Sequence, residues 1–306
     1  MVLGVVSVAS FEDLTSHALW SGAAYGLLGA GFGLILGVTG RFHFAYGFTY
    51  TLSAYMAFTF WDRVNLPFWP ASALGVLFAT AVGVLIERFV YRPLVARAGA
   101  TALLAVFVAS LGIGIAGENL ISLLWSSSSQ NFLGPTQTVH AWGTNIRFLN
   151  FDWWQALCGL VLVLVLAAVL RFTSLGRQIK ATRVNPELAT VIGINANTIY
   201  LVCFAIGTLF SAVAAFWYAV QYTVSPDMGE RPVIFAFVVA FLAGTARGPV
   251  RAFFTGVAVA LIEKWSTMFI STRWQQTAVF VILLVYLISK SLEDKQFFRR
   301  LVPARS

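Results

Sequence analysis

Charged residues are scarce in this 306-residue chain, and their scarcity excludes a soluble globular protein. Only 10% of the residues are charged, 59% are hydrophobic, and the mean hydropathy is +0.81. Soluble domains carry about 25% charged residues. The composition therefore predicts a polytopic membrane protein whose residues 1–306 form a single transmembrane domain.

Cysteine and histidine are also rare. The two cysteines, Cys158 and Cys203, fall inside apolar runs, so we expect free core thiols and no disulfide framework. The three histidines, His17, His43 and His140, are scattered, without metal-ligand or Ser/His/Asp spacing. We expect no enzyme, no metal site and no cofactor bound by this chain.

Long apolar runs dominate the chain instead. Crossing about 30 Å of hydrocarbon takes about 20 apolar residues. The runs are continuous and rich in Leu, Ala and Gly, which argues against the ten-residue alternation of an outer-membrane barrel. We predict an all-α transmembrane bundle with about nine segments, near 18–38, 44–61, 67–87, 101–124, 153–170, 198–221, 232–246, 252–270 and 274–290.

The basic residues predict the orientation. The first 17 residues contain no Lys or Arg, so we expect no cleaved signal peptide. If the N-terminus is outside, most of the 20 Lys and Arg residues fall on the cytoplasmic side, as the positive-inside rule requires. The C-terminus is then cytoplasmic. The inner set is Arg41, Arg88, Arg92, Arg97, Arg171, Arg177, Lys180, Arg183, Arg247, Arg251, Lys290, Lys295, Arg299, Arg300 and Arg305; the outer set is Arg63, Arg147, Arg231, Lys264 and Arg273.

The stretch 37–47 interrupts two apolar runs with glycines, an arginine and a histidine. Bare peptide groups survive at membrane depth only where protein or a water-filled cavity covers them, so this broken helix marks a translocation path or, alternatively, is a plain loop at the membrane face. Glu118 and Asn119 lie within another run, where a polar group either lines a path or pairs with a neighbouring helix. The candidate path residues are Gly40, His43, Phe44, Tyr46, Glu118 and Asn119.

The loop 171–197 predicts a short helix on the inner side. Asn185 is an N-cap, Pro186 and Glu187 begin a first turn, and Gly193 offers a stop. Leu188, Val191 and Ile192 then form one apolar stripe on a helix too short to be stable alone. The helix must lie against the protein's own inner face or against a cytoplasmic partner.

Four motifs carry a family resemblance that covers about 18–295. They read Gly37-Val-Thr-Gly-Arg-Phe-His-Phe-Ala-Tyr-Gly47, then Glu87-Arg-Phe-Val-Tyr-Arg-Pro-Leu94, then Leu175-Gly-Arg177 with Asn185-Pro-Glu187 and Ile192-Gly-Ile-Asn195, and last Ser225-Pro-Asp-Met-Gly229. The chain resembles the shorter of the two permease types in branched-chain amino acid ABC importers. In that family the first motif reads roughly G-V-x-G-x-x-N-F-A-H-G and the second E-R-x-x-Y-R-P-L.

The resemblance implies a permease subunit in a bacterial inner membrane, working by alternating access. Its expected partners are a second, different permease, ATP-binding cassette ATPase subunits, an external solute-binding protein, the cargo and membrane lipid, with no nucleic acid. A short cytoplasmic helix then couples the permease to the ATPase. That role is carried onto Arg183, Asn185, Pro186, Glu187, Leu188, Val191 and Ile192. The chain has no Gly-x-x-x-x-Gly-Lys-Ser/Thr loop, so partner subunits must hydrolyse ATP.

Two departures from the first motif concern the cargo. His43 stands where the family has Asn, and Tyr46 where it has His, which changes volume and hydrogen-bonding capacity. Branched-chain or related amino acids remain the first expectation, with small amides and organic acids open. His43 is alternatively a packed, neutral histidine. The competing function is a stand-alone channel or ion-coupled transporter, although no pair of acid-bearing broken helices is visible.

Overall fold

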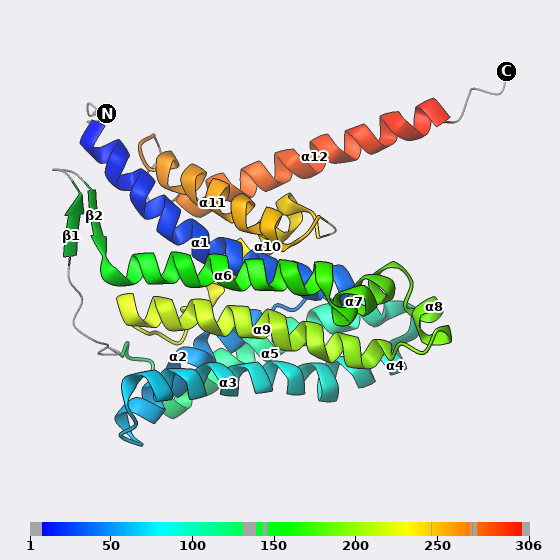
Figure 1. Ribbon diagram of the computed structural model, residues 1–306, viewed down its shortest axis with the longest axis horizontal. Helices are drawn as coiled ribbons and strands as arrows, with labels where there is room; N and C mark the ends of the chain where they lie inside the picture. The colour runs from blue at the N-terminus through cyan, green and yellow to red at the C-terminus, as the bar shows by residue number, and fades with distance from the viewer. Residues whose placement is uncertain are drawn as a thin grey trace.

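The structure, a computed structural model, describes residues 8–130, 139–142, 146–245, 247–269, 271 and 274–301. Arg273 and Arg305, which the charge argument used, lie outside these residues. Most of the described chain is helical (Figure 1). The α-helices are α1 Val8–Thr39, α2 Tyr46–Asp62, α3 Phe68–Ile86, α4 Arg92–Ala98, α5 Ala102–Trp125, α6 Asn150–Phe172, α7 Ser174–Val184, α8 Pro186–Val191, α9 Ala196–Gln221, α10 Glu230–Ala243, α11 Pro249–Ser266 and α12 Gln275–Leu301. A π-helical turn, η1 Glu87–Tyr91, joins α3 to α4, and a 3-10 turn, η2 Gly99–Thr101, precedes α5.

Each predicted apolar run coincides with a helix, but two helices are longer than predicted. Helix α1 begins at Val8 rather than near residue 18, and α12 continues to Leu301. The extra turns carry charged residues such as Glu12 and Asp13. Backbone hydrogen bonding extends a helix past its apolar part, so hydropathy underestimates its length.

Four stretches are long and apolar enough to cross a membrane: Phe11–Thr39, Phe68–Trp125, Phe151–Phe172 and Ala196–Gln221. Helices α2 and α10 have 17 and 14 residues. Helix α11 carries Arg251, Glu263 and Lys264. The length and hydropathy of these four stretches indicate a membrane protein with several crossings. The count of nine crossings stays a prediction.

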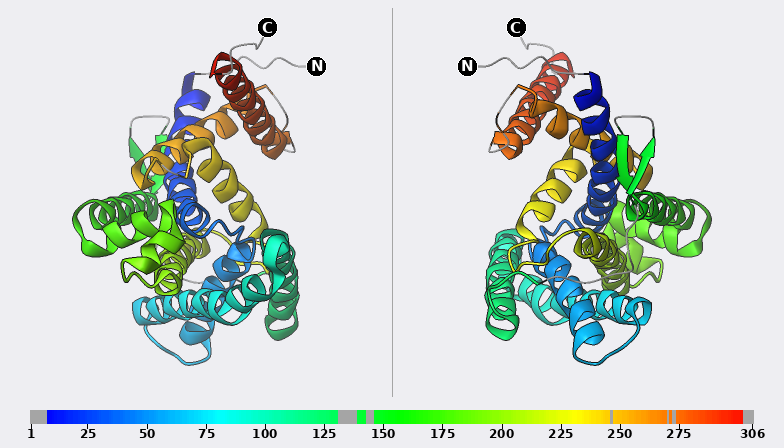
Figure 2. Two further views of the ribbon diagram at one scale, coloured as in Figure 1. Left: turned by 90° about the vertical axis from the view of Figure 1, so that its right-hand side faces the viewer. Right: turned by 90° about the vertical axis from the view of Figure 1, so that its left-hand side faces the viewer.

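Helix α1 occupies the centre of the bundle. It packs against α6, α9, α10 and α11. Viewed end-on in Figure 2, α11 and α12 lie at one end of the cross-section and α3 and α5 at the other. The core is built from apolar and aromatic side chains of these helices, including Phe32, Tyr55 and Phe204.

The crossing of α1 and α11 depends on glycine. A Cβ placed on Gly256 would collide with the backbone of Gly26, and one on Gly22 would lie 2.6 Å from the Cα of Val257. Small residues allow such close approach of helix backbones in membrane bundles. Glycines in the first apolar run therefore serve packing.

We expect Gly256→Val to destabilise the protein by about 2 kcal/mol or more, because the added side chain forces the two helices apart. Thermal unfolding of the purified chain in detergent measures the change. Gly112→Val is the matched control, since nothing lies within 4 Å of a Cβ at that helical position. Equal melting temperatures for the two variants would contradict the close crossing.

One element departs from the all-α prediction. Strands β1 Val139–Trp142 and β2 Ile146–Leu149 form an antiparallel hairpin with Val139 opposite Leu149. The apolar runs predict no element between residues 124 and 153, where this hairpin lies. Four-residue strands are too short to give a period-two signal against a hydrophobic background.

Candidate functional site

The segment 40–45 separates α1 from α2, which confirms the predicted break. Gly40 follows the last residue of α1 with a φ of +68°, a left-handed conformation that glycine adopts without strain. Arg41 is only 5% exposed and His43 is fully buried. The backbone N–H of Phe44 donates to the Ser110 hydroxyl of α5 at 3.2 Å. Gly40 is exposed, whereas protein covers Arg41 to Ala45, so most of the segment is not an exposed surface loop.

An ion pair fastens the break to the end of α3. Nη1 of Arg41 donates to Oε1 of Glu87, and both side chains are buried. The Arg41 guanidinium also lies 5.0 Å from the centre of the Tyr200 ring of α9. Buried charges in proteins are paired because an isolated charge is costly to desolvate. This pair therefore ties three elements together.

His43 makes the second contact with the same π-helical turn. Its Nδ1 lies 2.9 Å from the Tyr91 hydroxyl, and its ring packs edge-on against Tyr91 and Phe204. The turn η1 thus presents Glu87 and Tyr91 together to the break. π-Helical turns within helices are often found at functional sites. Glu87 and Tyr91 belong to the second sequence motif, but the sequence alone does not predict that this motif contacts the break.

Tyr46 is packed rather than open. Its hydroxyl lies 3.1 Å from the carbonyls of Leu28 in α1 and Gly207 in α9, and the side chain is fully buried. His43 is likewise held in packing, with the Tyr91 hydroxyl as its partner. Neither side chain lines the two cavities described below. Their place in a path stays a prediction.

Glu118 and Asn119 lie on α5, apart from the break. Glu118 is half-buried, whereas Asn119 is exposed and donates to the Ile115 carbonyl of its own helix at 2.8 Å. Large apolar side chains surround them on the exposed face of α5. A carboxylate and an amide therefore sit on an otherwise apolar surface.

A polar cavity of about 260 Å³ opens near the end of the bundle where α6 begins and α9 ends. Four tyrosines contribute to its wall, and the Arg231 side chain at its edge is paired with Glu263 of α11. The sequence reading missed this site, although polar residues inside apolar runs were a signal for it. Its tyrosine and polar lining residues are His17, Ser21, Tyr25, Tyr50, Asp152, Gln155, Tyr218, Gln221, Tyr222, Arg231 and Lys264.

The predicted short helix on the 171–197 loop is present as α8. The Asn185 side chain accepts hydrogen bonds from the backbone of Glu187 and Leu188, each at 3.0 Å, and Gly193 follows with a φ of +87°. The cap, the proline and the stop are confirmed. The loop contains a second helix, α7, that the sequence reading did not predict; Thr173 caps it at the backbone of Gly176.

The apolar stripe of α8 is uncovered. Leu188, Val191 and Ile192 are 64%, 81% and 72% exposed, while Ala189 packs inward. A helix this short must lie against either its own protein or a partner. The rest of the described chain does not cover this stripe. The stripe faces outward from the described part of the chain.

Arg183, the first residue of the predicted coupling segment, lies at a cavity. It lies on α7, is half-buried, and lines a second cavity of about 810 Å³ with Lys180 and Ile179. Burial lowers the pKa of Arg183 below the usual arginine value. Arg183 thus lies at this cavity, and its role in ATPase coupling stays a prediction.

The described residues contain no group of three or more His, Cys, Asp or Glu side chains that could hold a metal ion. Cys158 and Cys203 are both free.

Comparison with known proteins adds sequence relatives. Residues 14–288 match the family model described as branched-chain amino acid transport system / permease component. The chain is 28% identical over 286 residues to the high-affinity branched-chain amino acid transport system permease protein BraD of Pseudomonas aeruginosa, covering 89% of this chain and 91% of BraD. It is 26% identical over 282 residues to the permease protein LivH of the same type of system in Salmonella typhimurium, covering 87% of this chain and 89% of LivH. A solved structure, PsaBC from Streptococcus pneumoniae in complex with Fab, aligns over 88% of both chains at 14% identity with a TM-score of 0.49.

Proposed function

The chain belongs to the permease-component family of branched-chain amino acid transport systems, and on that premise we propose that it is the permease subunit of an ATP-binding cassette importer for branched-chain or related amino acids. The family match over residues 14–288 carries the proposal. Members of this family are multi-pass membrane transport components and not enzymes. ATP is then hydrolysed by partner subunits, and an external binding protein delivers the cargo.

The exposed stripe of α8 supports a cytoplasmic ATPase partner. Large apolar side chains at three neighbouring positions cost free energy in water and mark interaction sites when they cluster. In an ABC importer the permease must receive the ATPase motion through a surface of this kind. We assign Leu188, Val191 and Ile192 to packing and Glu187 to polar contact with the ATPase.

The face of α5 supports a second, different permease as a partner. Glu118 and Asn119 lie among large exposed apolar side chains such as Ile115 and Leu120. A carboxylate exposed to lipid is expensive, whereas one that faces a water-filled path or another chain is not. We place the translocation path along this face, enclosed by two permeases that alternate in the side to which they open.

We expect Glu118→Gln to lower cargo uptake about tenfold, because it removes a charged hydrogen-bonding group from the path while keeping its size. Uptake by the reconstituted importer measures it. Ser122→Ala is the control, since the Ser122 hydroxyl bonds only to the Glu118 carbonyl of its own helix. Unaltered uptake in Glu118→Gln would remove this residue from the mechanism.

The orientation follows from charge. We place the protein in the bacterial inner membrane with the N-terminus outside and the C-terminus in the cytoplasm, so that the α7 and α8 loop meets the ATPase. The polar cavity near the start of α6 then opens outward, toward the side from which a binding protein delivers cargo. Cysteine accessibility of residues in the 171–197 loop, measured from each side, tests this orientation.

The cargo is tested by the whole importer. We would reconstitute the chain with its neighbouring permease, ATPase and binding-protein gene products and measure ATP hydrolysis against amino acids, small amides and organic acids. We expect stimulation by leucine, isoleucine or valine. Stimulation only by amides or organic acids would refute the amino acid assignment while leaving the importer assignment standing.

A further inference from the structure

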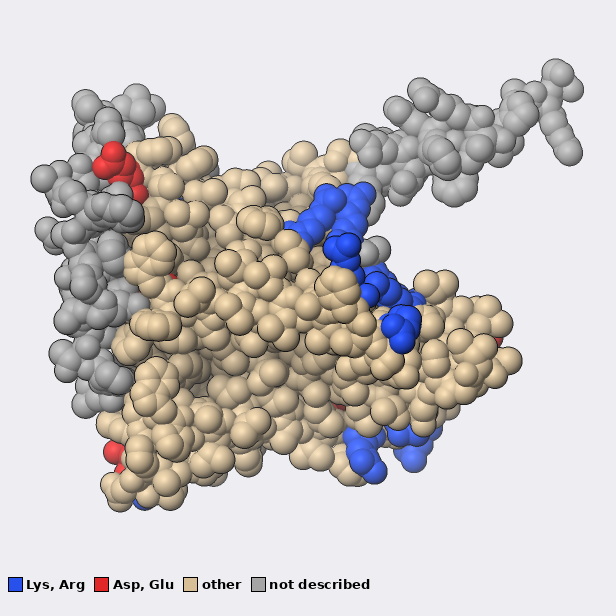
Figure 3. Space-filling view, viewed as in Figure 1, with Lys and Arg blue, Asp and Glu red and all other residues tan. Residues whose placement is uncertain are grey.

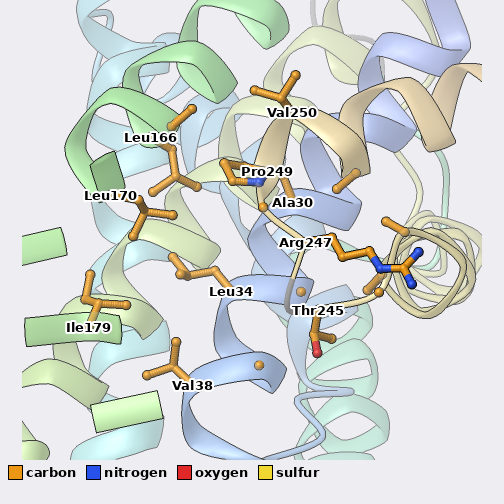
Figure 4. Close-up of a pocket in the computed structure, with 18 of the residues that line it drawn as sticks. Ala30, Leu34, Val38, Leu166, Leu170, Ile179, Thr245, Arg247, Pro249 and Val250 are labelled. Carbon is orange, nitrogen blue, oxygen red and sulfur yellow. The ribbon is translucent and has the colours of Figure 1, made fainter. Parts of the chain in front are cut away.

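A cavity of about 810 Å³ lies at the end of the bundle where α1 and α6 finish. Leu34 and Val38 of α1 face Leu166 and Leu170 of α6 and Ile179 of α7 across it (Figure 4). Glycines of α1 and the turn between α10 and α11 complete the wall. Its depth is therefore apolar and is too large to be filled by a single water-sized molecule.

The rim of this cavity is basic. Arg171, Lys180 and Arg183 line it from the α6 and α7 side, and no Asp or Glu is among its lining residues. None of the three forms an ion pair within the described part of the chain. Arg247 also lines the cavity, with its guanidinium turned away from the apolar group (Figure 4). Figure 3 shows Lys and Arg gathered at this end of the molecule, over α7 and the loop between α10 and α11.

The cavity also stands beside an exposed apolar face of α6. Leu157, Val161, Leu164 and Val165 expose their side chains along α6 and lead to Arg171, next to the exposed Phe172. A helix that changes from exposed apolar residues to arginine marks the level of lipid headgroups. An acyl chain can therefore enter the apolar space while a phosphate stays at the rim.

We propose that this cavity binds an anionic phospholipid, with one acyl chain against Leu34, Leu166 and Ile179 and the phosphate held by Arg171, Lys180 and Arg183. Unpaired cations at a rim without acids select a negatively charged headgroup. The apolar interior selects a lipid over a soluble phosphate. This proposal requires only that the chain lies in a membrane. If no lipid binds, the importer assignment still stands.

The test measures lipid binding by the full-length protein purified with its partner subunits in detergent. Phosphatidylglycerol is titrated and followed by native mass spectrometry, with phosphatidylcholine and glycerol 3-phosphate as comparison ligands. We expect retention of phosphatidylglycerol only. Arg171→Gln combined with Lys180→Gln should weaken it at least tenfold, since each lost charge costs about fivefold. Arg183 stays intact because it is also a candidate ATPase contact.

Two matched variants make the outcome decisive. Arg92→Gln with Arg97→Gln removes the same charge from exposed positions at the same end, outside the cavity, and should leave binding unchanged. Ala167→Trp keeps the charges but fills the apolar space and should weaken lipid binding at least tenfold. Equal loss in the two double variants, equal retention of phosphatidylcholine, or equal binding of glycerol 3-phosphate would each overturn the proposal. Unchanged melting temperatures without lipid confirm that the variants are folded.

Discussion

Glu87→Gln is expected to destabilise the protein by about 3–5 kcal/mol and to leave little folded permease in the membrane. The substitution removes the counter-charge of Arg41, which is 5% exposed and has no other carboxylate partner among the described ion pairs. Breaking one side of a buried pair leaves a charge that the interior cannot solvate. Such a cost is a large part of a typical folding free energy of about 5–15 kcal/mol. Folded yield after detergent extraction and the melting temperature measure the effect.

The double variant Arg41→Met with Glu87→Met separates charge from packing. Replacing both partners by apolar side chains of similar size removes the desolvation cost together with the attraction. We expect it to be clearly more stable than Glu87→Gln alone. A single variant as stable as the double variant would show that Arg41 is not held by Glu87.

Leu188→Asp combined with Val191→Asp should abolish coupling to the ATPase while leaving the permease folded. Both side chains are mostly exposed in the described chain, so the substitutions cost little internal packing. At an interface each apolar side chain is worth about 1.5–3 kcal/mol when buried, and the new carboxylates add the cost of desolvating two charges. We expect ATPase affinity to fall at least about a hundredfold. Pull-down of the ATPase subunits by the purified permease measures the affinity.

Ala100→Asp is the control for this experiment. It adds a carboxylate at an exposed position of η2, outside the α8 stripe. ATPase binding should be unchanged in the control. Wild-type binding by the α8 double variant, with its melting temperature also unchanged, would show that the stripe is not the coupling surface.

Local features of the fold were predictable from the sequence. Asn185, Pro186 and Gly193 act through the backbone of their own neighbours, so their positions alone define α8. The apolar runs predicted the long helices, because a helix that crosses the membrane needs a continuous apolar stretch of sequence. Gly40 and the polar residues around it indicated the break between α1 and α2.

Contacts between distant segments were not predictable in this way. Arg41 and Glu87 are 46 residues apart, and no periodicity relates the break to the π-helical turn. The two cavities combine side chains from several helices each. Nothing in the sequence around Arg183 indicates that α7 places it at the cavity of about 810 Å³. Which residues from distant segments become neighbours depends on how the helices pack in three dimensions.

If this chain is a permease driven by a separate ATPase, leucine uptake requires the whole importer. Uptake of radiolabelled leucine into proteoliposomes tests this directly, comparing the chain alone with the chain reconstituted with its permease, ATPase and binding-protein partners. We predict uptake only in the full assembly and only with hydrolysable ATP. Leucine uptake by the chain alone, without ATP, would contradict the claim and identify a channel or an ion-coupled transporter.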